Sequence, residues 1–365
     1  MTKGKVDWIL FAAVILLVSV GLFFFSSASL GVLAKNEAKF YSILANQLLL
    51  GLGLGTFAML VLSRIPYRTW KRPAILIFIF TLLLTSLVFV PGIGFEHNGA
   101  TRWVAVGTLS LQPSEFLKFG FILFLAAWFT SKKDKVGDIK FGVVPFAIAL
   151  STVALIMLKQ PDTGTFLVMA ATALSMFFLA GARFRDLSIF VILGIAGLIL
   201  LVAFKPYIKE RLLTYIDPTN DPHGSSYQIQ QSLIAIGSGE IFGRGIGQSV
   251  QKFSYLPEPA GDSIFAVIGE EIGFVGGGIL VSLFALFILR GLKVAHRVGE
   301  PFGGLLASGI VLLIAFQAFL NIASLSGIFP LTGIPLPFMS HGGTALFITL
   351  AEIGILLNIS RYAGR

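Results

Sequence analysis

The feature that most constrains this sequence is a series of ten apolar runs, each close to the length that a helix needs to cross a bilayer. They lie at residues 8–28, 43–63, 73–91, 114–130, 141–158, 164–182, 187–205, 264–290, 303–325 and 342–360. About 20 apolar residues in a helix span the hydrocarbon core. We therefore predict an all-α, polytopic membrane protein with ten transmembrane helices, in which residues 1–365 form a single membrane domain.

Composition supports this class and excludes others. Of the 365 residues, 56% are hydrophobic and only 12% are charged, whereas a soluble globular protein carries roughly 25% charged residues. A chain so apolar is not intrinsically disordered. It also contains no cysteine, which excludes a disulfide-stapled secreted domain and thiolate zinc or iron–sulfur sites.

The distribution of basic residues predicts the orientation of the chain. With ten spans both termini lie on one side, and the termini and four connections of that side carry 17 Lys and Arg residues, against nine on the other side. Basic residues concentrate in cytoplasmic segments, so we expect both termini to be cytoplasmic. The net charge of +9 then mainly reflects topology, and we expect no nucleic-acid partner.

The longest connection, residues 206–263, is predicted to be extracytoplasmic. It contains two sets of apolar residues with helical spacing, namely Ile208, Leu212 and Tyr215, and Ile229, Leu233 and Ile236. Each set predicts a short amphipathic helix that lies at the membrane interface. Since most of the chain outside the spans is on this face, we expect function there.

Asp262 has the setting of a functional carboxylate. The segment before it contains two prolines and Gly261, and the eighth span follows almost directly. Asp262 is therefore expected at a helix N-terminus at the outer membrane boundary, near Glu258. Two roles stay open for it, an N-cap, for which Asp is among the preferred residues, and a catalytic base.

Basic residues of the outer loops are candidates for binding phosphate. Arg244 lies in a glycine-rich stretch at 243–247, shortly before Lys252. Such a stretch forms either a tight turn or a cradle of backbone N–H groups, and it matches neither a Walker motif nor a dinucleotide-binding fingerprint. Arg102 and Trp103 either anchor the membrane interface or bind a diphosphate and a sugar.

Ionisable residues also occur within and between the spans. Glu115 and Lys118 lie in the fourth span, three residues apart and thus on one helix face. Charged groups at membrane depth are costly, and the pair is either a structural ion pair or part of a functional site. Lys159 and Asp162 lie at an outer turn, which its Pro and Gly residues explain without accounting for the two charges.

The sequence gives little support for a metal site. The four histidines are scattered, and no Asp-x-Asp or paired-histidine spacing occurs. We expect no transition-metal site, while a carboxylate-bound Mg or Mn ion stays open as a cofactor.

Seven stretches, in order along nearly the whole chain, resemble the SEDS family of polytopic proteins (shape, elongation, division and sporulation). They are 90–94 with 98–103, 111–118, 160–165, 230–239, 251–258, 262–271 and 336–343. Residues 230–235 and 251–253 are more similar to the division branch than to the elongation branch. The chain departs from the family pattern at Ala260-Gly261-Asp262-Ser263, where His-Thr-Asp-Phe is usual, and at His341, where Tyr is usual.

The resemblance implies a peptidoglycan glycosyltransferase that polymerises lipid II at the outer face of the bacterial cytoplasmic membrane. It also implies a class B penicillin-binding protein and other division or elongation proteins as partners, in addition to membrane lipids. The family's essential loop aspartate matches Asp262, and its charged pair in the fourth span matches Glu115 and Lys118. Such a reaction inverts the anomeric carbon, so it needs a base on the attacking side and positive charge at the departing diphosphate.

We therefore predict Asp262 as the catalytic base. The residues expected to bind substrate are Arg102, Trp103, Glu115, Lys118, Lys159, Asp162, Arg244, Lys252, Glu258 and Ser340. A rival hypothesis is a flippase or transporter of lipid-linked precursors, with a path lined by Glu115, Lys118, Glu270 and Glu352. A third is a scaffold that only positions a penicillin-binding partner.

Overall fold

The computed structural model describes residues 4–97, 100–106, 109–132, 135–217 and 226–364. Within these residues the chain is mostly helical. Its helices are α1 (Trp8–Lys35), α2 (Glu37–Ala45), η1 (Asn46–Leu54), α3 (Gly55–Leu62), η2 (Tyr67–Lys71), α4 (Ala74–Ser86), η3 (Leu87–Phe89), α5 (Pro113–Ser131), η5 (Ile139–Val143), α6 (Val144–Lys159), α7 (Thr163–Leu179), α8 (Phe184–Phe204), α9 (Pro206–Ile216), α10 (Tyr227–Ser238), α11 (Gln251–Ser254), α12 (Ile264–Arg297), α13 (Pro301–Leu325) and α14 (Gly343–Ser360).

Eight helical segments of the described chain are long and apolar enough to cross a membrane. They are α1, the continuous segment Glu37–Leu62, α5, the segment Ile139–Lys159, α8, α12, α13 and α14. Two shorter apolar helices, Ala74–Phe89 and Thr163–Leu179, coincide with the third and sixth predicted spans. The helical, membrane-spanning class is confirmed, and ten crossings stay a prediction.

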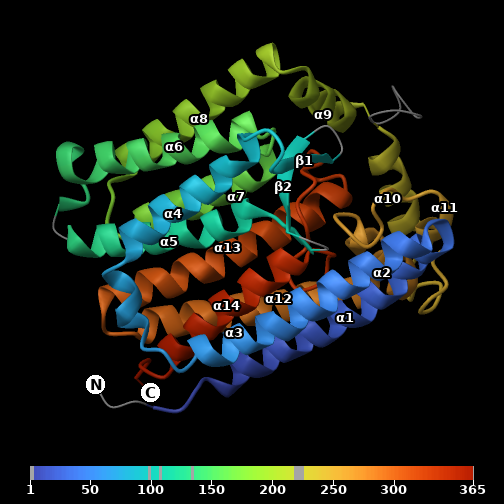
Figure 1. Cartoon of the computed structure of the whole chain (residues 1–365), viewed down its shortest axis with the longest axis horizontal. Coiled ribbons are helices and arrows are strands. Elements are labelled where there is room, and N and C mark those ends of the chain that lie inside the picture. Colours follow the sequence, from blue (N-terminus) through green and yellow to red (C-terminus); the bar gives the residue numbers. More distant parts are fainter. Residues whose placement is uncertain (1–3, 98–99, 107–108, 133–134, 218–225, 365) are drawn as a thin grey trace.

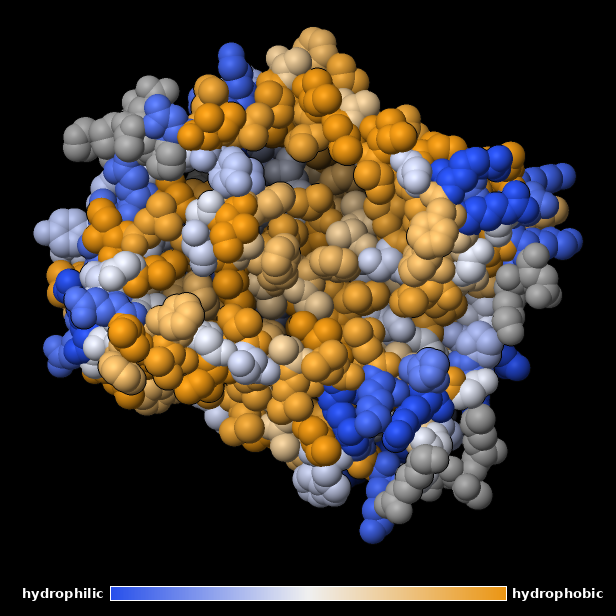
Figure 2. Space-filling view, turned by 180° about the vertical axis from the view of Figure 1, so that it is seen from behind, coloured by the Kyte–Doolittle hydropathy of each residue, from blue (hydrophilic) through white to orange (hydrophobic). Residues whose placement is uncertain are grey.

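The helices form an elongated bundle with different elements at its two ends (Figure 1). The N- and C-termini lie at one end, while β1, β2, α9, α10 and α11 gather at the other. A broad hydrophobic band separates hydrophilic surfaces at the two ends in Figure 2. Large apolar side chains are exposed within it, such as Leu193 and Ile199 on α8, as expected where a helix faces lipid instead of water.

A small antiparallel sheet lies in the connection before α5, which corrects the all-α prediction. Its strands are β1 (Gly94–His97), β2 (Ala100–Val106) and β3 (Leu109–Leu111), in the order β1-β2-β3. Phe95 pairs with Trp103, and Val104 pairs with Leu111. Aromatic and β-branched residues such as these favour strands, and the segment is too short and interrupted for a helical period to develop.

Both amphipathic helices predicted in the long outer connection are present, as α9 and α10. Ile208 is buried on α9 and Ile229 on α10, whereas Leu212, Tyr215 and Leu233 of the same two stripes stay exposed. Gln228, near the start of α10, hydrogen-bonds to the residues that precede α12. The long connection therefore folds back over the outer end of the bundle.

Helix α12 is broken at Gly273, whose φ of 64° is in the left-handed region. The break frees backbone groups that a continuous helix would pair, and the segment 240–245 pairs with them. Arg244 and Gly245 donate N–H groups to the carbonyls of Glu270 and Glu271, at 3.0 and 3.1 Å. In return, the carbonyls of residues 240 and 241 accept from residues 274 and 275, at 2.9 and 3.0 Å. Backbone groups at membrane depth need such internal partners.

Candidate active site

Asp262 lies just before α12, held by helices from three parts of the chain. The N-cap of α12 is Ser263, without a side-chain capping bond, so the interpretation of Asp262 as an N-cap is wrong. The Asp262 carboxylate accepts from Gln228 Nε2 of α10 at 3.2 Å. Its main-chain carbonyl accepts from Asn321 Nδ2 of α13 at 2.8 Å.

The environment of Asp262 changes its acidity. The pKa of the Asp262 carboxyl is raised from 3.8 to about 6, mainly because burial disfavours the charged form. The hydrogen bond from Gln228 and the charge of Arg211 lower this pKa, and the nearby Glu258 carboxylate raises it. The side chain is only half-buried by its neighbours, so one face stays open. A carboxyl group with a pKa near neutrality is ionised at pH 7 yet basic enough to take a proton.

Arg211 of α9 faces the same space as Asp262 and was not predicted from the sequence. Its Nη1 donates to the carbonyls of Leu331 and Thr332, at 3.2 and 3.1 Å. A Cβ added to the next residue, Gly333, would lie 3.6 Å from both Arg211 Nη2 and Asp262 Oδ2. The missing side chain of Gly333 thus leaves a gap between the guanidinium and the carboxylate. The signal was its position three residues after the buried Ile208, on the same helix face.

Arg102 joins this cluster from β2. It donates from Nε to the carbonyl of Gln160, at 3.3 Å, and from Nη2 to the carbonyl of Pro161, while Nη1 lies 3.7 Å from Asp162 Oδ1. Asp162 is buried and caps the N-terminus of α7. Burial lowers the pKa of Arg211, and the positive charge of Arg102 lowers it further. Two guanidinium groups therefore lie within electrostatic reach of each other, an arrangement that a bound anion would relieve.

The predicted pair Glu115 and Lys118 is formed inside the bundle. Lys118 Nζ lies 2.8 Å from Glu115 Oε2, and both side chains are buried. Lys118 also donates to Gln317 Oε1 of α13 at 2.7 Å, and Gln317 in turn donates to the carbonyl of Pro335 at 2.9 Å. The ammonium group is thus engaged by protein partners, as expected for a structural ion pair.

This pair is connected to the Asp262 region through the connection that follows α13. Asn321 Nδ2 donates to the carbonyl of Ile334 as well as to that of Asp262, each at 2.8 Å. Pro335 and Ile334 are neighbours in the chain. Gln317, which bonds to Lys118, and Asn321, which bonds to Asp262, therefore donate to the same short segment. The structure therefore joins two predicted site elements without bringing Lys118 to the outer gap.

Lys252 is engaged elsewhere than predicted. Its side chain is fully buried, with Nζ 2.6 Å from Glu271 Oε1, and it donates to Ser27 Oγ and to the carbonyl of Gly247, each at 2.9 Å. These contacts use the three ammonium donors. Its burial argues against the predicted contact with substrate.

Arg244 and the glycine-rich stretch are engaged in a similar way. Arg244 Nη1 lies 3.7 Å from Glu270 Oε1, and its Nε donates to the carbonyl of Ser238 at 3.2 Å. The N–H of Gly243 donates to the carbonyl of Gly239 at 2.7 Å. With the N–H groups of residues 244 and 245 paired to α12 as well, the stretch forms a turn against the helix break, and these three N–H groups are not available to bind phosphate.

The remaining predicted residues lie at or beside the outer end. Glu258 is near enough to raise the pKa of Asp262 and forms an ion pair with Lys39 at 3.6 Å. Ser340 is buried, and its Oγ accepts from the N–H of Leu336 at 2.7 Å. Trp103 lies on β2, and Lys159 is exposed, with its Nζ 4.8 Å from the centre of the Phe89 ring.

Three other expectations concern the Arg102 motif, a metal site and the transporter hypothesis. Asn98 and Gly99 of the Arg102 motif lie outside the described residues. Among the residues that are described, no group of three or more His, Asp or Glu side chains is arranged to hold a metal ion.

The charges named for the transporter hypothesis are not all close together. Glu270 accepts from Ser249 Oγ at 2.6 Å, whereas the buried Glu352 lies within electrostatic reach of Lys118 and Glu115. The four charges of the transporter hypothesis therefore fall into two separate groups.

Comparison with known proteins gives matches over nearly the whole chain. The model of the cell cycle protein family that carries the names FtsW, RodA and SpoVE matches residues 7–365. Stage V sporulation protein E of Bacillus subtilis is 40% identical over 361 residues, which cover 99% of this chain and 98% of that protein. A probable peptidoglycan glycosyltransferase FtsW of Geobacter sulfurreducens is 40% identical over 353 residues, covering 95% and 94%.

Solved structures show the same fold. A chain from a peptidoglycan synthase complex, solved to describe how polymerization and crosslinking are coordinated, has a TM-score of 0.78 at 30% identity, with 98% of both chains covered. The rod shape determining protein RodA of Thermus thermophilus has a TM-score of 0.68 at 26% identity, covering 99% of this chain and 98% of that one. The helical bundle described above is thus shared with proteins of known structure.

Proposed function

The chain belongs to the cell cycle protein family of FtsW, RodA and SpoVE, and we propose that it polymerises lipid II into glycan strands at the outer face of the bacterial cytoplasmic membrane. Its activity is that of a peptidoglycan glycosyltransferase, the name carried by relatives about 40% identical over most of the chain. The observation that carries the proposed site is the half-buried Asp262 carboxylate, which faces Arg211 across the gap at Gly333.

In this proposal Asp262 is the general base. A sugar hydroxyl of one substrate attacks the anomeric carbon of the other, its proton passes to the Asp262 carboxylate, and the bond from that carbon to the lipid diphosphate breaks. The raised pKa of about 6 supports this role, because a base is most effective when its pKa is near the working pH. The bonds from Gln228 and Asn321 fix the carboxylate and its backbone, which favours a preorganised geometry.

The departing diphosphate needs positive charge. We assign this role to Arg211 and Arg102, whose guanidinium groups lie within electrostatic reach of each other. Arg211 also lies across the gap from Asp262. Charge-assisted hydrogen bonds from arginine to phosphate are strong and well directed. Lys118 and Arg244, which were predicted to bind substrate, lie apart from this gap, because Lys118 bonds to Gln317 inside the bundle and Arg244 lies against Glu270. Because the leaving group belongs to the lipid donor, no nucleotide is required.

Among the described residues no group of three or more His, Asp or Glu side chains is arranged to hold a metal ion. The proposed mechanism uses protein residues alone, and a carboxylate-bound Mg or Mn ion stays a prediction. We further propose ten crossings with both termini in the cytoplasm, one membrane domain over residues 1–365, and a crosslinking partner of the class B penicillin-binding type. That partner is supported by the match to a peptidoglycan synthase complex; other division or elongation proteins and membrane lipids are proposed as further partners.

The decisive test is polymerisation of labelled lipid II by purified Asp262→Asn, with and without the partner. Asparagine keeps the shape and can still accept from Gln228, but it does not take the proton, so the rate should fall by about 10²- to 10⁴-fold. Thermal stability and lipid II binding should persist.

The matched control is Glu210→Gln, which neutralises an exposed carboxylate of α9 in the same outer connection and should leave the rate unchanged. Near-normal polymerisation by Asp262→Asn would remove the catalytic assignment. If the wild-type protein forms no glycan but moves lipid II across the membrane of vesicles, the result supports the transporter hypothesis. If it does neither, the result supports the scaffold hypothesis.

A further inference from the structure

A pocket lies at the end of the bundle opposite Asp262, where the two termini meet the end of α12. It has a volume of about 860 Å³ and is formed by residues 4–9, the last turns of α12 and residues 360–364. The chain segments around it are joined by backbone contacts. Gly4 N–H donates to the carbonyl of Arg361 at 2.8 Å, and Asp7 N–H donates to Ser360 Oγ at 3.2 Å. The pocket is thus part of the folded structure, far from Asp262.

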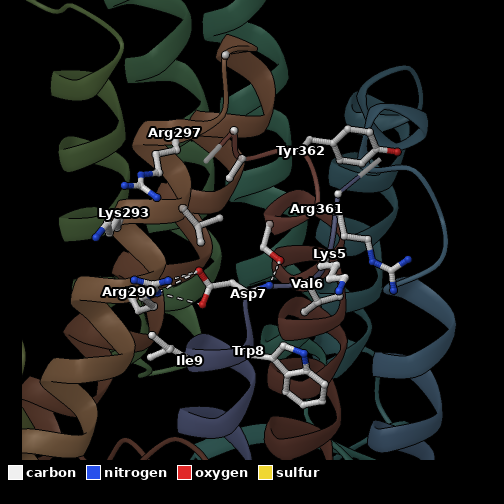
Figure 3. A pocket seen from close by; sticks show the side chains of 16 residues that line it. Lys5, Val6, Asp7, Trp8, Ile9, Arg290, Lys293, Arg297, Arg361 and Tyr362 are labelled. Carbon is white, nitrogen blue, oxygen red and sulfur yellow. Dashed lines mark hydrogen bonds and ion pairs between the residues drawn. The ribbon is translucent and has the colours of Figure 1, made fainter. Parts of the chain in front are cut away.

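The walls of this pocket are strongly basic. Figure 3 shows Arg290, Lys293 and Arg297 on one wall and Lys5 and Arg361 on the other. Asp7, the single acid among the described lining residues, lies between the two walls. It forms an ion pair with Arg290, with Asp7 Oδ2 2.9 Å from Arg290 Nη2. Its remaining oxygen accepts from Arg290 Nε at 3.0 Å.

Four cations of the lining therefore have no compensating charge. Lys5, Lys293, Arg297 and Arg361 form no ion pair with any residue that the structure describes. Nε of Arg361 is, moreover, buried without a hydrogen-bond partner there. A buried donor without a partner is costly, and several cations around one cavity repel each other. An anionic group with acceptor oxygens would reduce the repulsion between the cations and accept a hydrogen bond from Arg361 Nε.

The surface next to the pocket carries exposed apolar side chains. On α1, Trp8 is 69% exposed and Ile9 is 48% exposed, and Leu289 of α12, next to Arg290, is 68% exposed. Tryptophan is typical of the membrane interface. An occupant with both acyl chains and a charged phosphate would contact the apolar surface and the basic pocket together.

We propose that this pocket binds the phosphate headgroup of an anionic phospholipid from the leaflet that faces the termini. Lys293 and Arg297 contact the phosphate from α12, Arg361 contacts it from the C-terminal segment, and the acyl chains lie along Ile9 and Leu289. Basic pockets between transmembrane helices bind such headgroups elsewhere, and arginine matches phosphate geometry. The bound lipid joins the start of α1 to the ends of α12 and α14.

The test is lipid binding by the purified full chain in neutral detergent, measured by native mass spectrometry. The added ligands are phosphatidylglycerol, phosphatidylcholine and inorganic phosphate. We expect phosphatidylglycerol to bind at least about tenfold more tightly than phosphatidylcholine, and the double variant Lys293→Gln with Arg297→Gln to lose this preference, since each basic group contributes to headgroup binding. Inorganic phosphate should not compete at equal concentration.

Matched variants keep the result interpretable. Lys135→Gln with Lys140→Gln removes two exposed charges of another connection predicted on the same side and should retain the preference, as should the exchange Lys293→Arg with Arg297→Lys. An equal loss in the Lys135 and Lys140 control would mean non-specific attraction and overturn the proposal. Equally tight binding of phosphatidylcholine, or full competition by inorganic phosphate, would also overturn it. A double variant that fails to fold leaves the exchange and the competition arms decisive.

Discussion

At the scale of single residues, Asp262 combines two opposing demands. Its carboxyl is set where burial disfavours the charged form, yet Arg211 and Gln228 are placed to support that form. Groups whose pKa is moved toward neutrality by burial and by specific charges are typical of catalytic sites. The acidity of Asp262 therefore has measurable consequences, for rate and for stability, that run in opposite directions.

The rate of polymerisation should depend on the charge of Asp262. A general base acts when deprotonated, so with a pKa of about 6 the rate should be level above pH 7 and fall by about tenfold per pH unit below 6. With the ordinary value of 3.8, the rate would stay level down to about pH 4. The measurement is the pH profile of kcat/KM for lipid II with the purified complex, and a level profile down to pH 4.5 would contradict the prediction.

Stability provides the control for this profile. Because the folded state holds the Asp262 proton more tightly than the unfolded state does, the contribution of this group to stability rises as pH falls from about 6 to about 4. Loss of rate in that window is then not explained by Asp262-linked unfolding. A melting temperature recorded at each pH separates the two effects.

Residues also differ in how well the sequence predicted them. Asp262 was found because a proline-containing loop and a helix start are both local signals. Arg211 was missed, since its approach to Asp262 depends on how α9 folds back over residues 331–333. The burial of Lys252 was not predicted, because a basic residue in an outer loop is usually solvated and only the tertiary contact with Glu271 buries it.

At the scale of elements, the pair in α5 holds helices together. Removing either Glu115 or Lys118 leaves a buried charge without its partner, which costs about 3–5 kcal/mol. We expect Glu115→Ala and Lys118→Ala each to lower the melting temperature and the activity. The exchange Glu115→Lys with Lys118→Glu should recover most of both, because it restores an opposite-charge pair at the same spacing.

The measurement is thermal unfolding in detergent beside lipid II polymerisation. Recovery of stability without activity would mean that Lys118 contacts substrate after all. Recovery of both supports the structural role indicated by its bond to Gln317.

The break in α12 gives a second prediction at this scale. Gly273→Ala would strain a backbone with φ of 64°, and the new Cβ would collide with the backbone of Gly243 and Ile241. We expect a loss of about 1–3 kcal/mol in the free energy of unfolding. Gly278→Ala, on the same helix with open space around it, should be neutral or slightly stabilising. Equal thermal unfolding of the two variants would contradict the prediction that the break at Gly273 requires a glycine.

Elements were predictable to different degrees. The apolar runs indicated the spanning helices because a bilayer demands long, uninterrupted helices, and the 3.6-residue period gave α9 and α10. The sheet at 94–111 was missed, since its short strands depend on pairing with each other. The break at Gly273 was hidden as well, because glycine is tolerated in membrane helices and only the docking of residues 240–245 distinguishes it.

At the scale of the whole molecule, the two ends of the bundle carry different chemistry. One end carries α9, α10 and the sheet (Figure 1), and Asp262, Arg102 and Arg211 belong to these elements or bond to them. The other has both termini and a basic pocket (Figure 3). Their separation by the hydrophobic band means that orientation decides which leaflet supplies each ligand. The proposed reaction requires the Asp262 end to face outward, as the distribution of basic residues predicts.

This orientation can be tested directly because the chain contains no cysteine, so a single introduced thiol is the only one that reacts. Lys209→Cys lies at an exposed position of α9, and Lys140→Cys lies at an exposed position of η5, at the start of the segment Ile139–Lys159. The cells are treated so that reagents reach the outer face of the cytoplasmic membrane while that membrane stays closed. A membrane-impermeant maleimide should then label position 209 at once, and position 140 only after the cytoplasmic membrane is opened. The two positions share residue type and exposure, so intrinsic reactivity does not explain a difference. The reverse order of labelling would put Asp262 on the cytoplasmic face, where an outer-leaflet substrate does not reach it, and would overturn both the proposed reaction and the assignment of leaflets to the two ends.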